Sequence, residues 1–83
     1  METLRKRIFY KATHRGMHET DKIVGGFAVQ ELKNLSEDLL YDFDKLLDVP
    51  DVDLLNWILG RDRVPRSFDN RIFQLIVTFK ESL

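Results

Sequence analysis

The chain contains no cysteine among its 83 residues. This excludes disulfide scaffolds, thiolate zinc sites, iron–sulfur clusters and thiol catalysis, and it fits a reducing compartment. Long apolar runs are also lacking, because runs such as Leu75-Ile76-Val77 end after three residues whereas a bilayer span needs about 20. The N-terminus has no apolar segment of the kind found in signal peptides. We expect a complete cytoplasmic chain that does not insert into a membrane.

An excess of positive charge is missing as well. Lys and Arg number 13, Asp and Glu number 14, and the net charge is −1, whereas nucleic-acid binders usually carry a basic excess. The charge is unevenly spread, with a net of +3 over residues 1–22, −6 over 37–53 and +2 over 61–71. Two interpretations remain open. The blocks are either solvated faces and helix caps, or a bipolar docking surface whose basic end meets an anionic partner or a cofactor phosphate.

The spacing of apolar residues is helical along nearly the whole chain. Leu4, Ile8 and Ala12 recur every four residues, which is the period of one helix face, and no alternating strand pattern is present. We predict an all-α fold, a compact bundle of five short helices in a single domain over residues 1–83. The expected helices cover residues 2–14, 17–33, 37–48, 52–59 and 68–82. The expected core consists of Ile8, Phe27, Leu40, Phe43, Leu47, Leu55, Ile58, Ile72 and Phe79.

Polar and special residues mark the helix ends. Ser36 precedes two acids and is expected to cap the third helix. Pro50 should stop that helix, and Asp51 is then expected to cap the next one. Gly60 is placed to end the fourth helix. The pair Gly25-Gly26 lies inside the second helix and indicates close helix packing or a kink.

The densest polar string is the segment 14–21, His-Arg-Gly-Met-His-Glu-Thr-Asp. One interpretation is structural: Gly16 ends the first helix with positive φ, Arg15 bonds to the preceding carbonyls and Glu19 lies in the next first turn. The other is a polar contact site, because five ionisable groups fall within eight residues. Arg15 and Glu19 lie off the apolar stripes, so we expect both side chains to be exposed to solvent.

Catalytic and nucleotide-binding patterns are not present. His14 and His18 have a four-residue spacing, but a zinc site of the HExxH kind needs Glu directly after the first His, and Gly16 should break the helix between them. Neither glycine pattern of a phosphate loop occurs around Gly25-Gly26. A helix-turn-helix over 37–59 would bring acids to the DNA phosphates. We therefore expect no catalytic residue, no metal site and no nucleic-acid partner.

The segment Arg15-Gly16-Met17-His18-Glu19 matches the RGxxE motif, and through it the chain resembles the small flavin assembly factors, the SdhE and succinate dehydrogenase assembly factor 2 family. Many relatives carry Arg before the motif arginine, where this chain has His14. The similarity covers roughly residues 5–80 and extends to Arg7-Ile8, Tyr10, Asp21, Gly25, Phe27-Ala28, Phe43 with Leu46-Leu47, Asp51-Val52-Asp53-Leu54 and Trp57.

The resemblance implies a five-helix bundle that is not an enzyme. Proteins of this family bind the flavoprotein subunit of succinate dehydrogenase, and in bacteria that of fumarate reductase, and promote covalent attachment of FAD to it. Their location is the bacterial cytoplasm or, for a processed eukaryotic relative, the mitochondrial matrix. Carried onto this sequence, the partner-binding candidates are Arg15, Gly16 and Glu19, followed by Arg7, Tyr10 and Asp21.

The cofactor expectation follows from the same resemblance and from the missing nucleotide motif. We expect no cofactor bound stably by the chain itself, and we expect it to act on FAD held by the partner. The alternative is a small flavin-binding protein or flavin transferase that acts on its own through Glu19 or His18.

Overall fold

The backbone is helical over most of its length. The structure is a computed structural model that describes residues 2–83, and no strand occurs in that part of the chain. The longer helices are α1 (Glu2–Thr13), α4 (Glu37–Leu46), α5 (Asp51–Ile58) and α6 (Arg71–Glu81). A further helix consists of three consecutive pieces: α2 (His18–Thr20), a π-helical turn η1 (Asp21–Gly25) and α3 (Gly26–Glu31). Two short 3₁₀ turns are η2 (Leu32–Asn34) and η3 (Arg66–Phe68).

The residues that join α2, η1 and α3 all have helical backbone angles. Asp21 has φ −60° and ψ −40°, and Gly25 has φ −65° and ψ −42°. The three elements therefore form one continuous helix, and the prediction of an all-α fold with five helices is confirmed.

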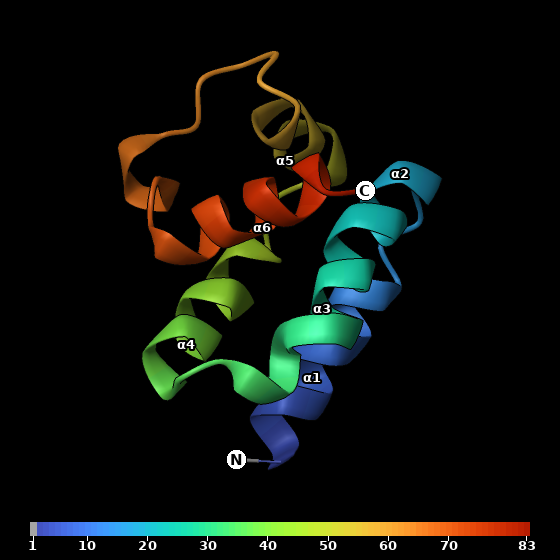
Figure 1. Cartoon of the computed structure of the whole chain (residues 1–83), viewed down its shortest axis with the longest axis vertical. Coiled ribbons are helices and arrows are strands. Elements are labelled where there is room, and N and C mark those ends of the chain that lie inside the picture. Colours follow the sequence, from blue (N-terminus) through green and yellow to red (C-terminus); the bar gives the residue numbers. More distant parts are fainter. Residues whose placement is uncertain (1) are drawn as a thin grey trace.

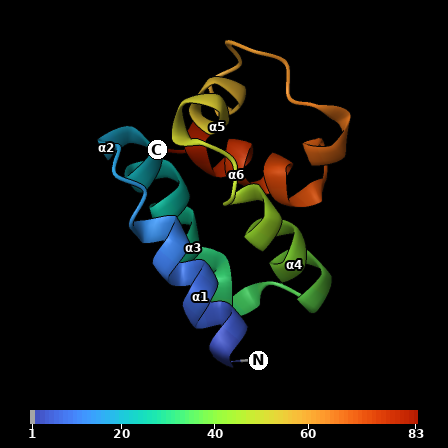
Figure 2. The same ribbon diagram turned by 180° about the vertical axis from the view of Figure 1, so that it is seen from behind.

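The helices pack into one globule of 34 × 26 × 23 Å. Helices α1 and α3 lie side by side, α4 lies opposite them, and α6 crosses between the two groups with α5 packed against it (Figure 1). The view from behind shows that α2 and the C-terminus lie together, at the end of the molecule far from the N-terminus (Figure 2). The connection that carries the RGxxE segment is thus placed at one end of the bundle.

The core sits where all these helices meet. Phe27 of α3 and Phe43 of α4 contact edge to face, with ring centroids 5.6 Å apart, a geometry that aromatic pairs prefer. Eight of the nine expected core residues are buried, and the exception is Phe79. Phe79 is only partly buried, because it lies in the last turns of α6 and lines a surface hollow together with Phe27.

Two of the predicted helix ends are confirmed and two are corrected. The Ser36 hydroxyl accepts a bond from the Leu39 N–H at 3.4 Å, and Gly60 has φ +76°. Asp51 does not cap α5, because its carboxylate bonds to Arg15 instead. The last helix begins at Arg71 rather than near 68, since the Asn70 side chain accepts the first-turn N–H of Phe73 at 3.1 Å.

The paired glycines permit close packing on both sides of their helix. A Cβ atom at Gly25 would lie 3.2 Å from the Ala12 carbonyl oxygen, and one at Gly26 would lie 3.3 Å from the Phe79 ring. Both distances are shorter than ordinary van der Waals contacts. The predicted close approach is confirmed, and it brings α1 against the helix that begins at the RGxxE segment.

We expect Leu47→Ala to lower the free energy of unfolding by roughly 2–5 kcal/mol, because it opens a cavity in the core. Leu47 is 4% exposed, whereas the matched control Leu83 is 60% exposed, so Leu83→Ala should change stability by less than about 0.5 kcal/mol. Urea denaturation of the two variants measures the difference. Equal losses for both would contradict this placement of the core.

Candidate partner-binding site

The RGxxE segment begins in a sharp turn between α1 and α2. Helix α1 ends at Thr13, Gly16 has φ +93°, and Met17 is extended with φ −111° and ψ 130°. The prediction of positive φ at Gly16 is confirmed, and glycine tolerates this conformation without a Cβ clash. His14 and His18 therefore lie on either side of a chain reversal rather than on one helix face.

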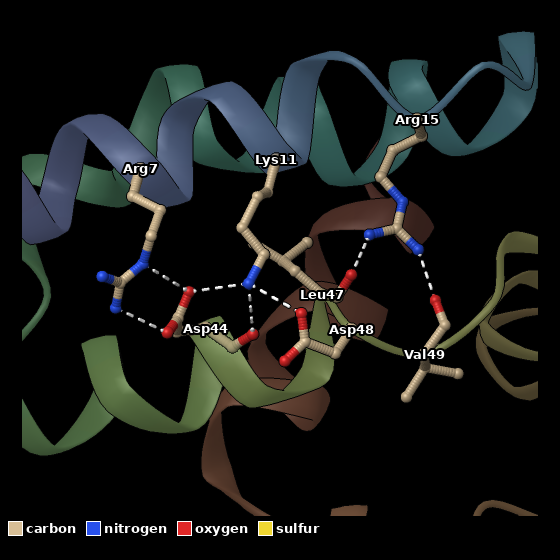
Figure 3. Close-up of polar contacts among 7 residues, drawn as sticks. All are labelled: Arg7, Lys11, Arg15, Asp44, Leu47, Asp48 and Val49. Carbon is tan, nitrogen blue, oxygen red and sulfur yellow. Dashed lines mark hydrogen bonds and ion pairs between the residues drawn. The ribbon is translucent and has the colours of Figure 1, made fainter.

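Arg15 is the most constrained side chain of the segment. Its Nε donates to Asp51 Oδ1 at 2.5 Å, Nη2 donates to the Val49 carbonyl at 2.5 Å, and Nη1 donates to the Leu47 carbonyl. Figure 3 shows the guanidinium reaching both carbonyls from across the gap between α1 and α4. The forked, planar arrangement of guanidinium donors suits several acceptors at once.

The expectation that Arg15 is exposed is wrong, because only 8% of its side chain is accessible. The physical reason is that backbone carbonyls at the end of α4 and just after it need hydrogen-bond donors. The last carbonyls of a helix have no intrahelical partner. Arg15 supplies donors to the carbonyl of Leu47, the C-cap residue of α4, and to that of Val49 in the segment that follows. The structural interpretation of Arg15 was wrong in one detail, since it placed these carbonyls on the preceding helix, whereas they belong to the end of α4 and the segment after it.

Asp21 also stabilises the turn between α1 and α2, from the side of α2. Its Oδ1 accepts the backbone N–H of Arg15 at 2.9 Å, and the residue is partly buried. Arg15 and Asp21 together fix the position of the turn between α1 and α2. Both candidate residues thus make contacts inside the chain.

The other RGxxE residues are available to solvent. Glu19 is exposed as predicted, and so are Gly16 and His18, while Met17 is half-buried. Apart from Gly16 itself and its two neighbours in the chain, no residue has an atom within 4 Å of the place where a Gly16 Cβ would be. None of the four ion pairs among the side chains of residues 3–83 involves Glu19. Glu19 lines a shallow hollow whose other walls are His18, Lys22, Ile23, Leu59, Lys80 and Leu83.

Tyr10 and His14 form an ordered pair on the exposed side of α1. Their rings are stacked with centroids 4.1 Å apart and planes 16° apart. The His14 Nδ1 lies 3.0 Å from the Tyr10 carbonyl oxygen. Tyr10 is 63% exposed, so this candidate residue is accessible to a partner.

Basic residues of α1 face acidic residues at the end of α4. Arg7 Nη2 lies 2.8 Å from Asp44 Oδ2, and Lys11 Nζ lies 2.9 Å from Asp44 Oδ1 and 2.8 Å from Asp48 Oδ1 (Figure 3). The acidic block is therefore partly neutralised within the chain, and Arg7 is engaged by Asp44 although half of its side chain is exposed.

Both charge blocks are visible in the sequence, but the pairing between them was not predicted. The available signal was the shared spacing, since Arg7, Lys11 and Arg15 recur every four residues, as do Asp44 and Asp48. Equal spacing on two antiparallel or parallel helices allows successive charges to meet across the interface. The carbonyl acceptors of Arg15 left no such trace, because every residue has a carbonyl.

The paired charges shift one another's pKa values. Partial burial acts to raise the pKa of Asp44, but the hydrogen bonds from Arg7 and Lys11 outweigh it and hold that pKa below its usual range. Desolvation acts to lower the pKa of Lys11, but Asp48 and Asp44 raise it overall. The Asp44 hydrogen bond raises the pKa of Arg7. All three groups are charged near neutral pH.

The paired glycines do not form a phosphate-binding loop. Gly25 and Gly26 lie within a helix and pack against Ala12 and Phe79, so their backbone N–H groups do not form an open phosphate loop. Within residues 2–83, no helix is long and apolar enough to cross a membrane.

We expect the unfolding free energy to decrease as the pH falls below about 4, partly through Asp44. A carboxyl group whose pKa is lowered by folding stabilises the protein above its unfolded pKa, and this contribution is lost as pH falls through the folded pKa. At pH 7, Asp44→Asn should cost about 1–2 kcal/mol, and its difference from the parent protein should shrink towards pH 2.

The control for this pH dependence is Asp42→Asn, because Asp42 has no ion pair among the described residues. Its effect should stay within about 0.5 kcal/mol at both pH values. Denaturation curves at pH 7, 4 and 2 provide the measurement. An Asp44→Asn penalty that does not change with pH would show that the ion pairs carry none of the acid sensitivity.

The second prediction for the site concerns Arg15. We expect Arg15→Ala to cost roughly 2–4 kcal/mol of stability, because two carbonyls and a partly buried carboxylate lose their donor. Arg15→Lys should recover only part of the loss, since an ammonium group lacks the fork. Arg63→Ala is the matched control, because Arg63 is exposed in the loop after α5. Thermal melts showing no difference between Arg15→Ala and Arg63→Ala would rule out the structural role.

Comparison with known proteins agrees with these motifs. Residues 6–80 match the family described as the flavinator of succinate dehydrogenase. A succinate dehydrogenase assembly factor 2, mitochondrial, from Dictyostelium discoideum is 40% identical over 76 residues, which are 92% of this chain and 54% of the relative. A FAD assembly factor SdhE from Acetobacter pasteurianus is 36% identical over 61 residues, 74% of this chain and 56% of the relative.

The similarity covers more of this chain than of its relatives. An assembly factor 2 from Cryptococcus neoformans var. neoformans is 46% identical over 64 residues, 77% of this chain and 37% of the relative. The chain thus spans about half the length, or less, of these curated relatives. Because the family match extends over nearly the whole sequence, from residue 6 to residue 80, the chain belongs to the succinate dehydrogenase flavinator family of assembly factors.

Proposed function

We propose that this protein binds the flavoprotein subunit of succinate dehydrogenase and promotes the covalent attachment of FAD to it. The observation that carries the proposal is that Glu19 is exposed and has no ion pair among the side chains of residues 3–83, while the turn before it is held in place by partly buried hydrogen bonds. An interface gains most from groups that are already ordered before binding.

The residues of the RGxxE segment divide into two roles in this proposal. Glu19 contacts the flavoprotein, and Gly16 lets the partner approach the backbone closely because no side chain covers it. Arg15 and Asp21 act as positioning residues, since both are engaged inside the chain. Tyr10 of α1 is 63% exposed and contributes a further contact with the partner.

Arg7 has a smaller part in partner binding than the family resemblance implies. Its guanidinium is bound to Asp44 through two nitrogen atoms, at 3.4 and 2.8 Å. A partner carboxylate would have to compete with Asp44 for this group. We therefore assign Arg7 mainly to the contact between α1 and α4.

The protein acts in this proposal by binding rather than by chemistry. A factor that binds one conformation of the flavoprotein more tightly shifts the population towards that conformation, and a population with FAD and its attachment site correctly oriented reacts faster. FAD stays with the flavoprotein. The chain supplies no catalytic group in this scheme. The same surface serves the flavoprotein of fumarate reductase in bacteria, and the site of action is the bacterial cytoplasm or the mitochondrial matrix.

We expect Glu19→Ala to abolish most covalent flavin on the partner while it changes stability by less than about 0.5 kcal/mol. A central interface contact is worth 2 kcal/mol or more, whereas an exposed side chain contributes little to folding. Flavin fluorescence of the denatured flavoprotein after gel electrophoresis measures attachment, and thermal melts measure stability.

The matched control is Glu37→Ala, because Glu37 is an exposed glutamate in the first turn of α4, outside the RGxxE segment. It should leave attachment at the parent level. Normal attachment with Glu19→Ala would contradict the contact role, and unfolding of that variant would make Glu19 a structural residue. Titration of the isolated protein with FAD adds a further test, since tight stoichiometric binding would favour a flavin-binding protein that acts alone.

A further inference from the structure

An apolar groove lies along the exposed side of α1, outside the RGxxE segment. Phe9 is 43% exposed and Tyr10 is 63% exposed, and two exposed aromatic side chains beside each other make a contiguous apolar surface. Together they line an open hollow of about 480 Å³, and most of its surface is apolar. The remaining walls are Arg5, Lys6, His14 and Leu32.

The walls of this groove are held in place by bonds within the chain. The Arg5 guanidinium donates to the Leu32 carbonyl at 3.3 Å and to the Leu35 carbonyl at 2.9 Å, which ties α1 to the end of the neighbouring helix. On the other side, the Tyr10 ring is stacked on His14. A groove with ordered aromatic walls loses little conformational entropy when it is filled.

The groove is continuous with the RGxxE segment. Tyr10 and His14 line it, and the same two residues line a second hollow together with Lys11, Arg15, Leu47 and Asp51. His14 directly precedes Arg15 in the chain. A partner that covers the RGxxE turn therefore reaches the groove without a break in the surface.

The rim of the groove carries one positive charge that has no ion-pair partner among the side chains of residues 3–83. Helix α1 has four basic residues, and three of them are engaged, Arg5 by carbonyls and Arg7 and Lys11 by Asp44. Lys6 is exposed, and none of the ion pairs among the side chains of residues 3–83 involves it. An occupant with an acidic group beside its apolar group would match both features of the site.

We propose that this groove binds an apolar side chain of the flavoprotein subunit, next to an acidic residue that pairs with Lys6. The inference rests on the proposed function and adds a second contact region to it. A second copy of this chain fits less well, because a two-fold symmetric contact centred on the groove would bring the cationic rims of both copies together. The aromatic groove then supplies most of the apolar contact, and the RGxxE segment supplies the polar contact.

The test measures the affinity of the protein for the purified flavoprotein subunit by biolayer interferometry. The double variant Phe9→Ser/Tyr10→Ser should raise the Kd at least tenfold, because aromatic anchors in a pocket dominate interface energies. Tyr41→Ser is the matched control, since Tyr41 is 52% exposed on α4 and lies outside the groove. It should leave the Kd within twofold of the parent value.

Lys6→Glu keeps the test independent of any folding defect in the aromatic variant, because the Lys6 side chain is exposed. It should lower the association rate severalfold at low salt, and added salt should reduce the difference. Parent-level Kd values for both the aromatic variant and Lys6→Glu would overturn the groove proposal while leaving the proposed function intact.

Two further outcomes are distinguishable. If the parent protein does not bind the flavoprotein at all, the proposed function itself fails. If sedimentation shows a dimer of the parent protein that Phe9→Ser/Tyr10→Ser disperses without a change in flavoprotein affinity, the occupant is a second copy and the present assignment is wrong.

Discussion

The contact between Arg15 and the segment that joins α4 to α5 is the constraint on which the site depends. One guanidinium satisfies the Leu47 and Val49 carbonyls and pairs with Asp51, so the end of one helix, the start of another and the turn after α1 are fixed by a single side chain. Burying a charge is unfavourable unless it is paired and hydrogen-bonded. Here all three acceptors are present, and the RGxxE turn therefore has a defined position at the end of the bundle.

This arrangement separates the parts of the RGxxE segment that stabilise from the parts that are accessible. The arginine side chain points inward and the glutamate side chain points to solvent, while the glycine between them provides the reversal that makes both directions possible. Within this five-residue motif, the position of Arg15 can thus be required for folding and the position of Glu19 for binding. Loss of function after substitution within it is informative only when stability is measured on the same variant.

Much of the fold was predictable from the sequence, because it depends on periodicity. The four-residue spacing of Leu4, Ile8 and Ala12 is a property of one helix face, and Gly16 is a local signal for a helix end. The inward direction of Arg15 was not predictable in this way. Its partners are mainly carbonyl groups more than 30 residues away, and a carbonyl has no signature in the sequence. Asp51 illustrates the same limit, since its position suited a helix cap and its carboxylate is used for a tertiary contact instead.

The close approach at Gly25 has a mechanical consequence for the charged contacts of α1. Helix α1 meets Gly25, where a Cβ would lie 3.2 Å from Ala12 O, and it also meets α4, where Arg7 and Lys11 reach Asp44. The absence of a side chain at Gly25 thus helps to set the position of α1. A larger residue at that position would displace α1, so the packing at one buried glycine and the geometry of the surface ion pairs are coupled through the same helix.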